Sequence, residues 1–365
     1  MLHRKVNRFL KELRVNIGKF IFDRKENKKE FKLSEIKKII FLMYRDKIGD
    51  SIVNTIMYKE LKKVYPEIEI TVLTGKAGAS ILKNNFDIDK IVIWENKKNI
   101  KNINLLKELR KKNYDLLINL DDFNFFKSLY IVNVINATVN MGFNKEDYKI
   151  YDVSINWKQE IYHESDKCIE ILKKFDIFRK SLNYSIYLSE EEMENAQKFW
   201  RNKKGLKIVL NFYGASKHRT FHILKCIEIL KELRNIEFEY SVGIIFPPDK
   251  KKEILKISEK AGDSNVYIVD NILTIRESAA IVKKADVLIT PETSLVHIAS
   301  AFEIPQIAIY RDKTTKEVWA PLYKNFKMIV TGKRDINDIN IKMIIEGLKE
   351  FYKNNSFLKL REEIK

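Results

Sequence analysis

Cysteine is scarce in this 365-residue chain, which contains only Cys168 and Cys226. The two residues are far apart, are flanked by apolar residues, and have no second Cys or His at the short spacing that zinc sites use. The cysteines therefore give no indication of a zinc site. They favour two buried thiols in a reducing compartment.

Long hydrophobic runs are also absent. The sequence has no stretch of about 18 consecutive apolar residues, so we expect no transmembrane helix. The N-terminus is basic and its apolar residues are dispersed, which is not the pattern of a secretory signal. These two absences favour a cytoplasmic protein.

Two nucleotide-binding motifs are missing as well. No G-x-G-x-x-G follows the first expected strand, and no G-x-x-x-x-G-K-[ST] occurs anywhere in the chain. Both absences argue against a dinucleotide-dependent dehydrogenase and against a P-loop kinase.

Positive charge, by contrast, is abundant, with a formal net charge of +18. Such an excess indicates an anionic partner, which could be nucleic acid, a membrane surface or a phosphorylated substrate. A nucleic-acid-binding protein is only a remote alternative, because basic and aromatic residues are not interleaved and no known binding module occurs. We therefore expect no nucleic-acid partner.

The N-terminal extension, residues 1–32, carries eleven Lys or Arg against four Asp or Glu. Its apolar residues recur at helical spacing and predict one apolar stripe on a basic helix. Such a helix could lie on an anionic membrane, or its stripe could pack against the protein itself. The sequence leaves both interpretations open. The stripe consists of Leu2, Val6, Phe9, Leu10, Leu13, Ile17, Phe20 and Ile21.

From residue 33 the chain alternates between short β-rich runs and amphipathic helical runs. This alternation is typical of doubly wound parallel sheets, and it starts again near residue 207. We therefore predict an α/β fold with two Rossmann-like domains facing a central cleft, over residues 33–180 and 181–335, followed by a C-terminal helix over 336–365. The expected strands cover residues 36–44, 68–74, 90–94, 114–120, 207–212, 238–245, 266–269, 287–290 and 306–310, with an irregular stretch over 144–157. Among the expected helices, one covers residues 50–65 and another lies near residues 160–175.

The turn after the first expected strand offers a candidate base. Gly49 permits a sharp turn, and Asp50 stands where a helix N-cap would be. Asp50 could act only as that cap. Alternatively, its carboxylate could face a cleft beside Arg45 and Lys47 and act as a general base, because strand-end loops give access to a substrate hydroxyl.

Two turns in the second half are suited to phosphate. Residues 211–219 combine small residues and hydroxyls with a cluster of cations, including Ser216 and Arg219. In residues 285–299 a strand runs into a turn and then a helix that begins with Glu292, Thr293 and Ser294. Free N–H groups at such a helix start bind phosphate oxygens. His297 follows one turn later, although a lone helical histidine is more often a packed residue.

Three separated segments resemble glycosyltransferase family 9, the heptosyltransferases that build the inner core of lipopolysaccharide. The third segment is fairly specific, and the order and spacing hold over residues 37–330. The segments are Ile48-Gly49-Asp50-Ser51 with Tyr65-Pro66, Tyr114-Asp115-Leu116-Leu117-Ile118-Asn119-Leu120, and residues 285–299 with Ile304-Pro305 and Trp319-Ala320-Pro321.

The resemblance implies a GT-B fold and inverting, metal-independent transfer of heptose from ADP-heptose to a lipopolysaccharide core or related glycolipid. The resemblance also implies that the enzyme needs no cofactor and that it contacts the cytoplasmic face of the inner membrane as a peripheral protein. Asp50 falls on the family's proposed general base, with Arg45 and Lys47 on the acceptor or phosphate side. The donor-binding positions are Ser216, Arg219, Glu292, Thr293, Ser294 and His297.

Four positions depart from the family pattern. Glu292 stands where Asp is usual, Ser294 where Gly is usual, Arg219 where Lys is usual, and Phe221-His222 where Trp-Pro is usual. A longer acid moves its carboxylate, and Arg does not replace Lys neutrally. A GT-B transferase that uses another nucleotide sugar, for a different glycan or a protein acceptor, therefore remains an alternative. Asp121-Asp122 could indicate a metal site as in GT-A enzymes, but its place in the family pattern favours a structural turn.

Overall fold

The computed structural model describes residues 2–23, 28–95, 100–122, 125–158, 163–178, 182–270, 274–312, 317–332 and 335–354. The chain divides into two compact units. The first unit comprises Met1–Gln159 and Ser165–Lys180, and the second comprises Glu160–Glu164 and Ser181–Lys365. Each unit is described by itself.

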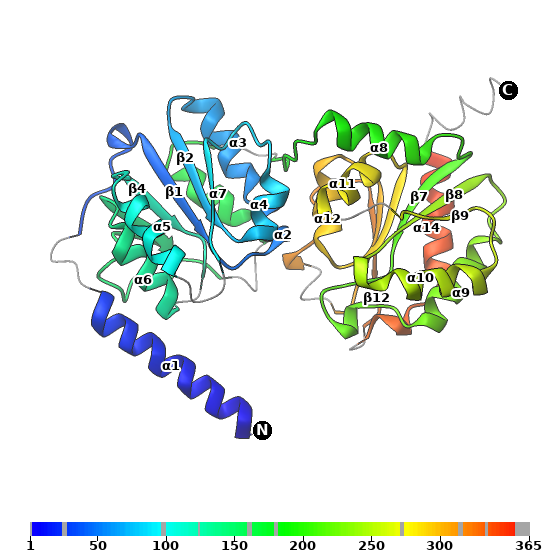
Figure 1. The fold of residues 1–365 in the computed structure, drawn as a ribbon, viewed down its shortest axis with the longest axis horizontal. Helices are drawn as coiled ribbons and strands as arrows, with labels where there is room; N and C mark the ends of the chain where they lie inside the picture. The colour runs from blue at the N-terminus through cyan, green and yellow to red at the C-terminus, as the bar shows by residue number, and fades with distance from the viewer. Residues whose placement is uncertain are drawn as a thin grey trace. The chain divides into compact units, whose positions relative to one another are not determined.

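The described part of the first unit contains a parallel six-stranded sheet of order β3-β2-β1-β4-β5-β6, with helices on both faces (Figure 1). Its elements are α1 (Leu2–Phe22), η1 (Leu33–Glu35), β1 (Lys38–Met43), α2 (Ile48–Val53), α3 (Thr55–Val64), β2 (Glu69–Thr74), α4 (Lys76–Leu82), β3 (Lys90–Ile93), α5 (Ile100–Arg110), β4 (Leu116–Asn119), α6 (Phe126–Ile135), β5 (Val139–Phe143), β6 (Val153–Ile155) and α7 (Asp166–Lys173).

The central strand β1 shows why these residues form a buried parallel strand. Its residues Ile39 to Leu42 are completely buried, because helices cover both faces of the sheet. Ile40 belongs to the cluster that includes Leu106 of α5 and Leu129 of α6. On the opposite face Phe41 meets Tyr58 of α3, with ring centroids 5.0 Å apart.

The second unit repeats this architecture, with a described six-stranded parallel sheet of order β12-β11-β10-β7-β8-β9. Its elements are α8 (Glu190–Trp200), β7 (Leu206–Asn211), η2 (Lys217–Arg219), α9 (Ile223–Leu233), β8 (Tyr240–Ile245), η3 (Pro248–Lys250), α10 (Lys251–Ala261), β9 (Val266–Ile268), α11 (Ile275–Lys283), β10 (Val287–Pro291), α12 (Ser294–Ala301), β11 (Gln306–Tyr310), β12 (Phe326–Val330), η4 (Ile336–Asp338) and α14 (Lys342–Asn354).

The two sheets have the same strand order when each is numbered from its own first strand. In both, the first strand lies between the second and the fourth, so the order reverses between β1 and β4 and again between β7 and β10. In open parallel sheets, ligands bind beyond the carboxyl ends of the strands at such a switch point. The C-terminal α14 belongs to the second unit, since Ile344 and Leu348 are part of its main core cluster.

The predicted α/β pattern is correct, with several local differences. The helix expected over 50–65 is two helices, α2 and α3, which meet at Asn54. Strands β5, β6 and β12 were not expected. The short edge strand β6 lies in the stretch that we expected to be irregular, and only the sheet supplies its pairing partner β5. The helix expected near 160–175 is α7, and residues 159–162 lie outside the described part.

Both cysteines are buried free thiols, as the sequence predicts. Cys168 on α7 and Cys226 on α9 belong to different units, and burial raises the pKa of the Cys226 thiol to about 12. In the parts of the chain that the structure describes, no helix is long and apolar enough to cross a membrane.

Helix α1 contacts α6, and Figure 1 shows the C-terminal end of α1 beside α6. Gly18 lies so close to α6 that an added Cβ would stand 3.2 Å from the Cα of Phe126, and Phe22 packs on Phe126 and Tyr130. The interpretation in which the stripe packs on the protein is therefore wrong for its described members. Val6, Leu10, Leu13, Ile17, Phe20 and Ile21 are between 42% and 80% exposed, and the side chains of Leu2 and Phe9 lie outside the described part.

Candidate active site

In the second unit, the sequence-predicted phosphate residues meet at the switch point of the sheet. Ser216 and Arg219 follow β7, and Glu292 and Thr293 follow β10, the strand paired with β7. Gly214 makes the tight turn possible, since an added Cβ would stand 2.2 Å from the carbonyl oxygen of Arg219. The Thr220 hydroxyl, which donates to the Ser216 carbonyl over 3.1 Å, fixes the same turn.

Arg219 and Glu292 form an ion pair although 73 positions separate them in the sequence. The guanidinium Nη1 donates to the Glu292 carboxylate over 2.7 Å. Burial nevertheless raises the pKa of Glu292 to about 7, since desolvation outweighs the favourable charge of Arg219, and Asp312 raises it further. This carboxylate therefore changes its charge near neutral pH.

Thr293 and Ser294 form the start of α12. Thr293 is the N-cap, and its hydroxyl accepts a hydrogen bond from the Leu295 amide over 3.2 Å. Ser294 is the first residue of the helix, beside the Arg219–Glu292 pair. The positive end of the helix dipole and the Arg219 cation thus lie on one edge of the sheet, which is an arrangement suited to an anion.

His297 lies inside the second unit rather than at its surface. Its side chain is 4% exposed, and its ring packs edge-on against Tyr184 and Trp319, each with ring centroids 5.7 Å apart. Burial lowers its pKa to about 3, with a smaller contribution from His163, so the imidazole is neutral near pH 7. Nδ1 has no hydrogen-bond partner among the described residues.

Sequence reasoning missed two charged residues at this edge. Arg311 and Asp312 follow β11, the next strand of the sheet, and pair with each other over 3.1 Å. Both affect the pKa of Glu292, Arg311 lowering it and Asp312 raising it. Their position directly after the strand expected over 306–310 was the signal that could have identified them.

In the first unit, Asp50 occupies the first turn of α2 but is not its cap. The N-cap is Lys47, and α2 begins at Ile48, so the capping interpretation of Asp50 is wrong. Asp50 instead lies 3.7 Å from the Lys47 ammonium, and its side chain is 34% exposed. An acid in the first turn favours the helix electrostatically while its carboxylate remains accessible.

Asp46 lies in the same turn as Asp50, and the sequence analysis did not identify it as a site residue. Its backbone has a positive φ of 53°, and its Oδ1 accepts hydrogen bonds from the amides of Ala77 and Gly78. It thus satisfies the free amides at the start of α4. Asp46 fixes the loop that carries Arg45 and Lys47.

Arg45 lies at the switch point of the first sheet. Its Nη1 is 3.7 Å from Oδ1 of Asp121, which follows β4, and its guanidinium stands 5.3 Å above the centre of the Phe125 ring. Burial raises the pKa of Asp121 to about 6; Arg45 and Lys145 oppose this, and Asp122 and Asp50 add to it. The structure therefore brings Arg45, Asp50 and Asp121 into one electrostatic group.

Asp121 and Asp122 have lysine partners that the sequence did not indicate. The Lys167 ammonium is 2.7 Å from Oδ2 of Asp122. The fully buried Lys145 donates to the carbonyls of Asp121 and Asp122 over 2.9 and 3.3 Å, and burial lowers its pKa to about 8. Among the described residues no group of three or more His, Cys, Asp or Glu is arranged to hold a metal ion.

Two parallel six-stranded sheets with the same strand order place the chain in the GT-B class of folds, which solved heptosyltransferases share. Within that class, the model of "Glycosyltransferase family 9 (heptosyltransferase)" matches residues 103–344, which is more than half of the chain. The chain therefore belongs to this family of glycosyltransferases.

Individual relatives agree with the family. A putative lipopolysaccharide heptosyltransferase 4 of Escherichia coli K12 is 26% identical, over 95% of this chain and 96% of the relative. The structure of a glycosyltransferase family 9 protein from Veillonella parvula aligns with a TM-score of 0.76 at 16% identity, over 90% of this chain and 100% of that one. E. coli ADP-heptose lps heptosyltransferase II aligns with a TM-score of 0.69 at 17% identity, over 89% and 99%.

Proposed function

We propose that this enzyme transfers heptose from ADP-heptose, with inversion, to a lipopolysaccharide core or a related glycolipid. The observation that carries the proposal is the position of Arg219 beside the start of α12, at the switch point of the second sheet. A leaving diphosphate needs a cation and free amides, and this edge offers both. The similarity to lipopolysaccharide heptosyltransferases supports heptose as the sugar and ADP as the nucleotide.

In this proposal the second unit stabilises the leaving group. As the bond between sugar and phosphate breaks, negative charge develops on the diphosphate. Arg219 neutralises that charge, and Thr293 and Ser294 place the helix start against it. Protonation of Glu292 releases Arg219 from its 2.7 Å pairing, so a proton on Glu292 favours the bound diphosphate.

The first unit supplies the base. The Asp50 carboxylate is accessible and is held in the first turn of α2, and Lys47 lies beside it. It accepts the proton of the acceptor hydroxyl as that oxygen attacks the anomeric carbon from the face opposite the diphosphate, which inverts the configuration. Arg45, clamped by Asp121 and Phe125, is a cation for a phosphorylated acceptor.

A donor panel tests the proposal. Purified enzyme is incubated with ADP-heptose, GDP-sugars and UDP-sugars, and both donor hydrolysis and transfer to a deep-core lipopolysaccharide acceptor are measured. We expect turnover with ADP-heptose. Turnover of UDP-sugars alone would refute the heptose proposal.

A specific observation favours the second candidate, a GT-B transferase for another nucleotide sugar. Glu292 stands where the family usually has Asp, and its carboxylate already engages Arg219. A Glu292 carboxylate that is paired with Arg219 is less available to accept a hydrogen bond from a sugar hydroxyl than an unpaired Asp would be. The donor panel separates the two candidates directly.

We further propose that α1 contacts the membrane that holds the acceptor. Its outward stripe exposes Leu13 and Phe20, and residues 1–32 are strongly basic, which suits an anionic bilayer. Leu13→Ser with Phe20→Ser should reduce sedimentation with phosphatidylglycerol vesicles. Phe178→Ser, at a phenylalanine that is 72% exposed elsewhere in the first unit, is the matched control and should not. Equal sedimentation of all three proteins would contradict the proposal.

A further inference from the structure

The second unit has a basic pocket at the edge of its sheet opposite to the Arg219–Glu292 pair. The pocket measures about 780 Å³ and is lined by Leu206 and Lys207 at the start of β7 and by Asp286 just before β10. Arg219 and Glu292 follow the other ends of these same parallel strands. The basic pocket is therefore separate from the donor turn.

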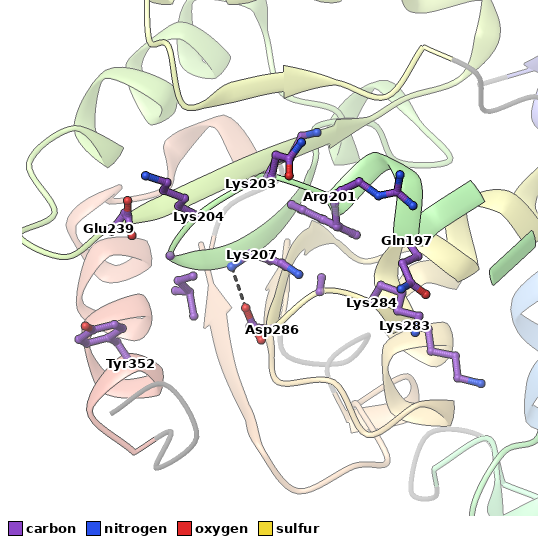
Figure 2. A pocket seen from close by; sticks show the side chains of 15 residues that line it. Gln197, Arg201, Lys203, Lys204, Lys207, Glu239, Lys283, Lys284, Asp286 and Tyr352 are labelled. Carbon is purple, nitrogen blue, oxygen red and sulfur yellow. Dashed lines mark hydrogen bonds between the residues drawn. The ribbon is translucent and has the colours of Figure 1, made fainter. Parts of the chain in front are cut away.

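The lining of the basic pocket has a large excess of positive charge. Of the residues that line it, six are cationic and only two, Glu239 and Asp286, are acidic. Figure 2 shows Lys204 and Glu239 on one side of the pocket and Lys283 and Lys284 on the other. The six cations are Arg201, Lys203, Lys204, Lys207, Lys283 and Lys284.

One of the two acids, Asp286, is already hydrogen-bonded to a backbone amide. The Asp286 carboxylate accepts the amide of Lys207 over 2.8 Å, which locks the starts of β7 and β10 together (Figure 2). In the described part of the chain, no carboxylate lies within ion-pair distance of Arg201, Lys204 or Lys284. No carboxylate in the described residues therefore neutralises their charges.

The loop that presents three of the cations is held in a defined conformation. Gly205 has a φ of +67°, and an added Cβ would stand 2.0 Å from the carbonyl oxygen of Glu239, so only glycine fits there. Asn202 also has a left-handed backbone. The Ser241 hydroxyl donates to the Lys204 carbonyl over 2.7 Å. The loop is thus preorganised, which lowers the entropic cost of binding a ligand.

Lys203 has a different role from the other cations. Its ammonium donates to the Phe199 carbonyl and lies 4.2 and 4.5 Å from the centres of the Phe199 and Tyr267 rings. Burial and the nearby charge of Lys207 lower its pKa. Lys203 therefore anchors the loop, and Arg201, Lys204 and Lys284 remain to meet a ligand.

We propose that the basic pocket binds a phosphate-bearing anion that carries two or more negative charges, at a site distinct from the nucleotide-sugar site. Ammonium and guanidinium groups from two segments of the chain, residues 201–207 and 283–284, line a volume that is ordinary for a ligand pocket. A multiply charged phosphate satisfies several of these groups at once. The ligand is either a soluble phosphate compound or the headgroup of an anionic lipid.

Calorimetric titration of the full-length protein with inorganic pyrophosphate tests this proposal. Wild-type protein should bind, and Lys204→Ala with Lys284→Ala should weaken binding at least about fivefold, since exposed charge pairs contribute modestly. The matched control is Lys256→Ala with Lys260→Ala, which removes two exposed charges from α10 of the same unit. It should leave binding unchanged.

A second arm distinguishes the two sources of phosphate. Sedimentation with cardiolipin vesicles, whose lipid carries two phosphates, identifies a lipid headgroup if it depends on Lys204 and Lys284, whereas dependence seen only with pyrophosphate identifies a soluble ligand. Three results overturn the proposal: equal losses in both double variants, loss of pyrophosphate binding in Arg219→Ala alone, or a homopolymeric RNA that binds through these lysines in preference to pyrophosphate. The test does not depend on donor turnover, so the proposed function can fail independently.

Discussion

The switch points of the two units differ in chemistry although their sheets have the same strand order. In the second unit Arg219 meets a buried carboxylate at 2.7 Å beside a helix start. In the first unit Arg45 lies 3.7 Å from Asp121, and the carboxylate of Asp50 remains 34% exposed. Strand order therefore decides where polar residues meet, and the residues after each strand decide whether that place suits an anion or a base.

The proposed mechanism places the base in the first unit and the diphosphate in the second, and the Asp50→Asn variant tests this division most strongly. We expect a loss of transfer of about 10²- to 10⁴-fold, because a neutral amide cannot accept the hydroxyl proton. ADP affinity, measured by calorimetry, should be unchanged. Near-normal turnover would show that Asp50 only stabilises the start of α2.

Arg219→Ala should have the complementary effect. Loss of a charge-assisted contact of about 1.5–3 kcal/mol should weaken ADP binding by roughly 10- to 150-fold. Arg219→Lys, which has the residue usual in the family, should lose less because the charge is retained. If ADP binds Arg219→Ala as well as wild type, the phosphate is not held at this turn.

His297 should make the second unit sensitive to acid. Its folded pKa of about 3 lies below the usual value of 6.5, so the unfolded chain takes up the proton first as pH falls. Stability conferred by the neutral ring is complete above pH 6.5 and should decrease by at most about 1.4 kcal/mol for each pH unit below it. His297→Phe keeps an aromatic ring and should flatten this dependence in urea unfolding between pH 6.5 and 5. Parallel curves for the two proteins would contradict the assignment.

Glu292 should give the smallest effect, on the pH dependence of ADP binding. Its pKa of about 7 means that a rise in pH from 6 to 8 ionises the carboxylate, which then competes with the diphosphate for Arg219. We expect ADP affinity to fall by up to about fivefold over this range, as for a partly exposed ion pair. Glu292→Gln should remove the dependence, and a wild-type affinity that does not change with pH would show that the pair stays closed.

The buried strands of both sheets could be predicted from sequence because continuous apolar runs carry a local signal. For example, Ile39 to Leu42 form an unbroken apolar run, and all four residues are buried. The edge strands β6 and β12 could not be predicted in this way, since only pairing with β5 and β11 makes them strands. The break at Asn54 between α2 and α3 also has no clear local signal.

The candidate site could be predicted where a residue lies in the turn or helix start that follows a strand. Arg45, Asp50, Ser216, Arg219, Glu292 and Thr293 were found in this way, with support from the family pattern. Lys145 and Lys167 were not, because nothing in their sequence surroundings distinguishes them from the many exposed lysines. Their burial beside Asp121 and Asp122 depends on the packing of β5, α7 and the end of β4.

The sequence by itself determined the fold class, the family and the turns that carry polar residues, because apolar periodicity and motif spacing are local properties of the chain. Only the tertiary structure decided which charges meet. In the structure Arg219 pairs with Glu292, 73 positions away in the sequence. The ring of His297 lies in the interior, and the apolar stripe of α1 faces outward. The tertiary structure also brought lysines from two distant segments, residues 203–207 and 283–284, together in the basic pocket. Coulomb interactions and desolvation depend on distances through space, which a sequence does not contain.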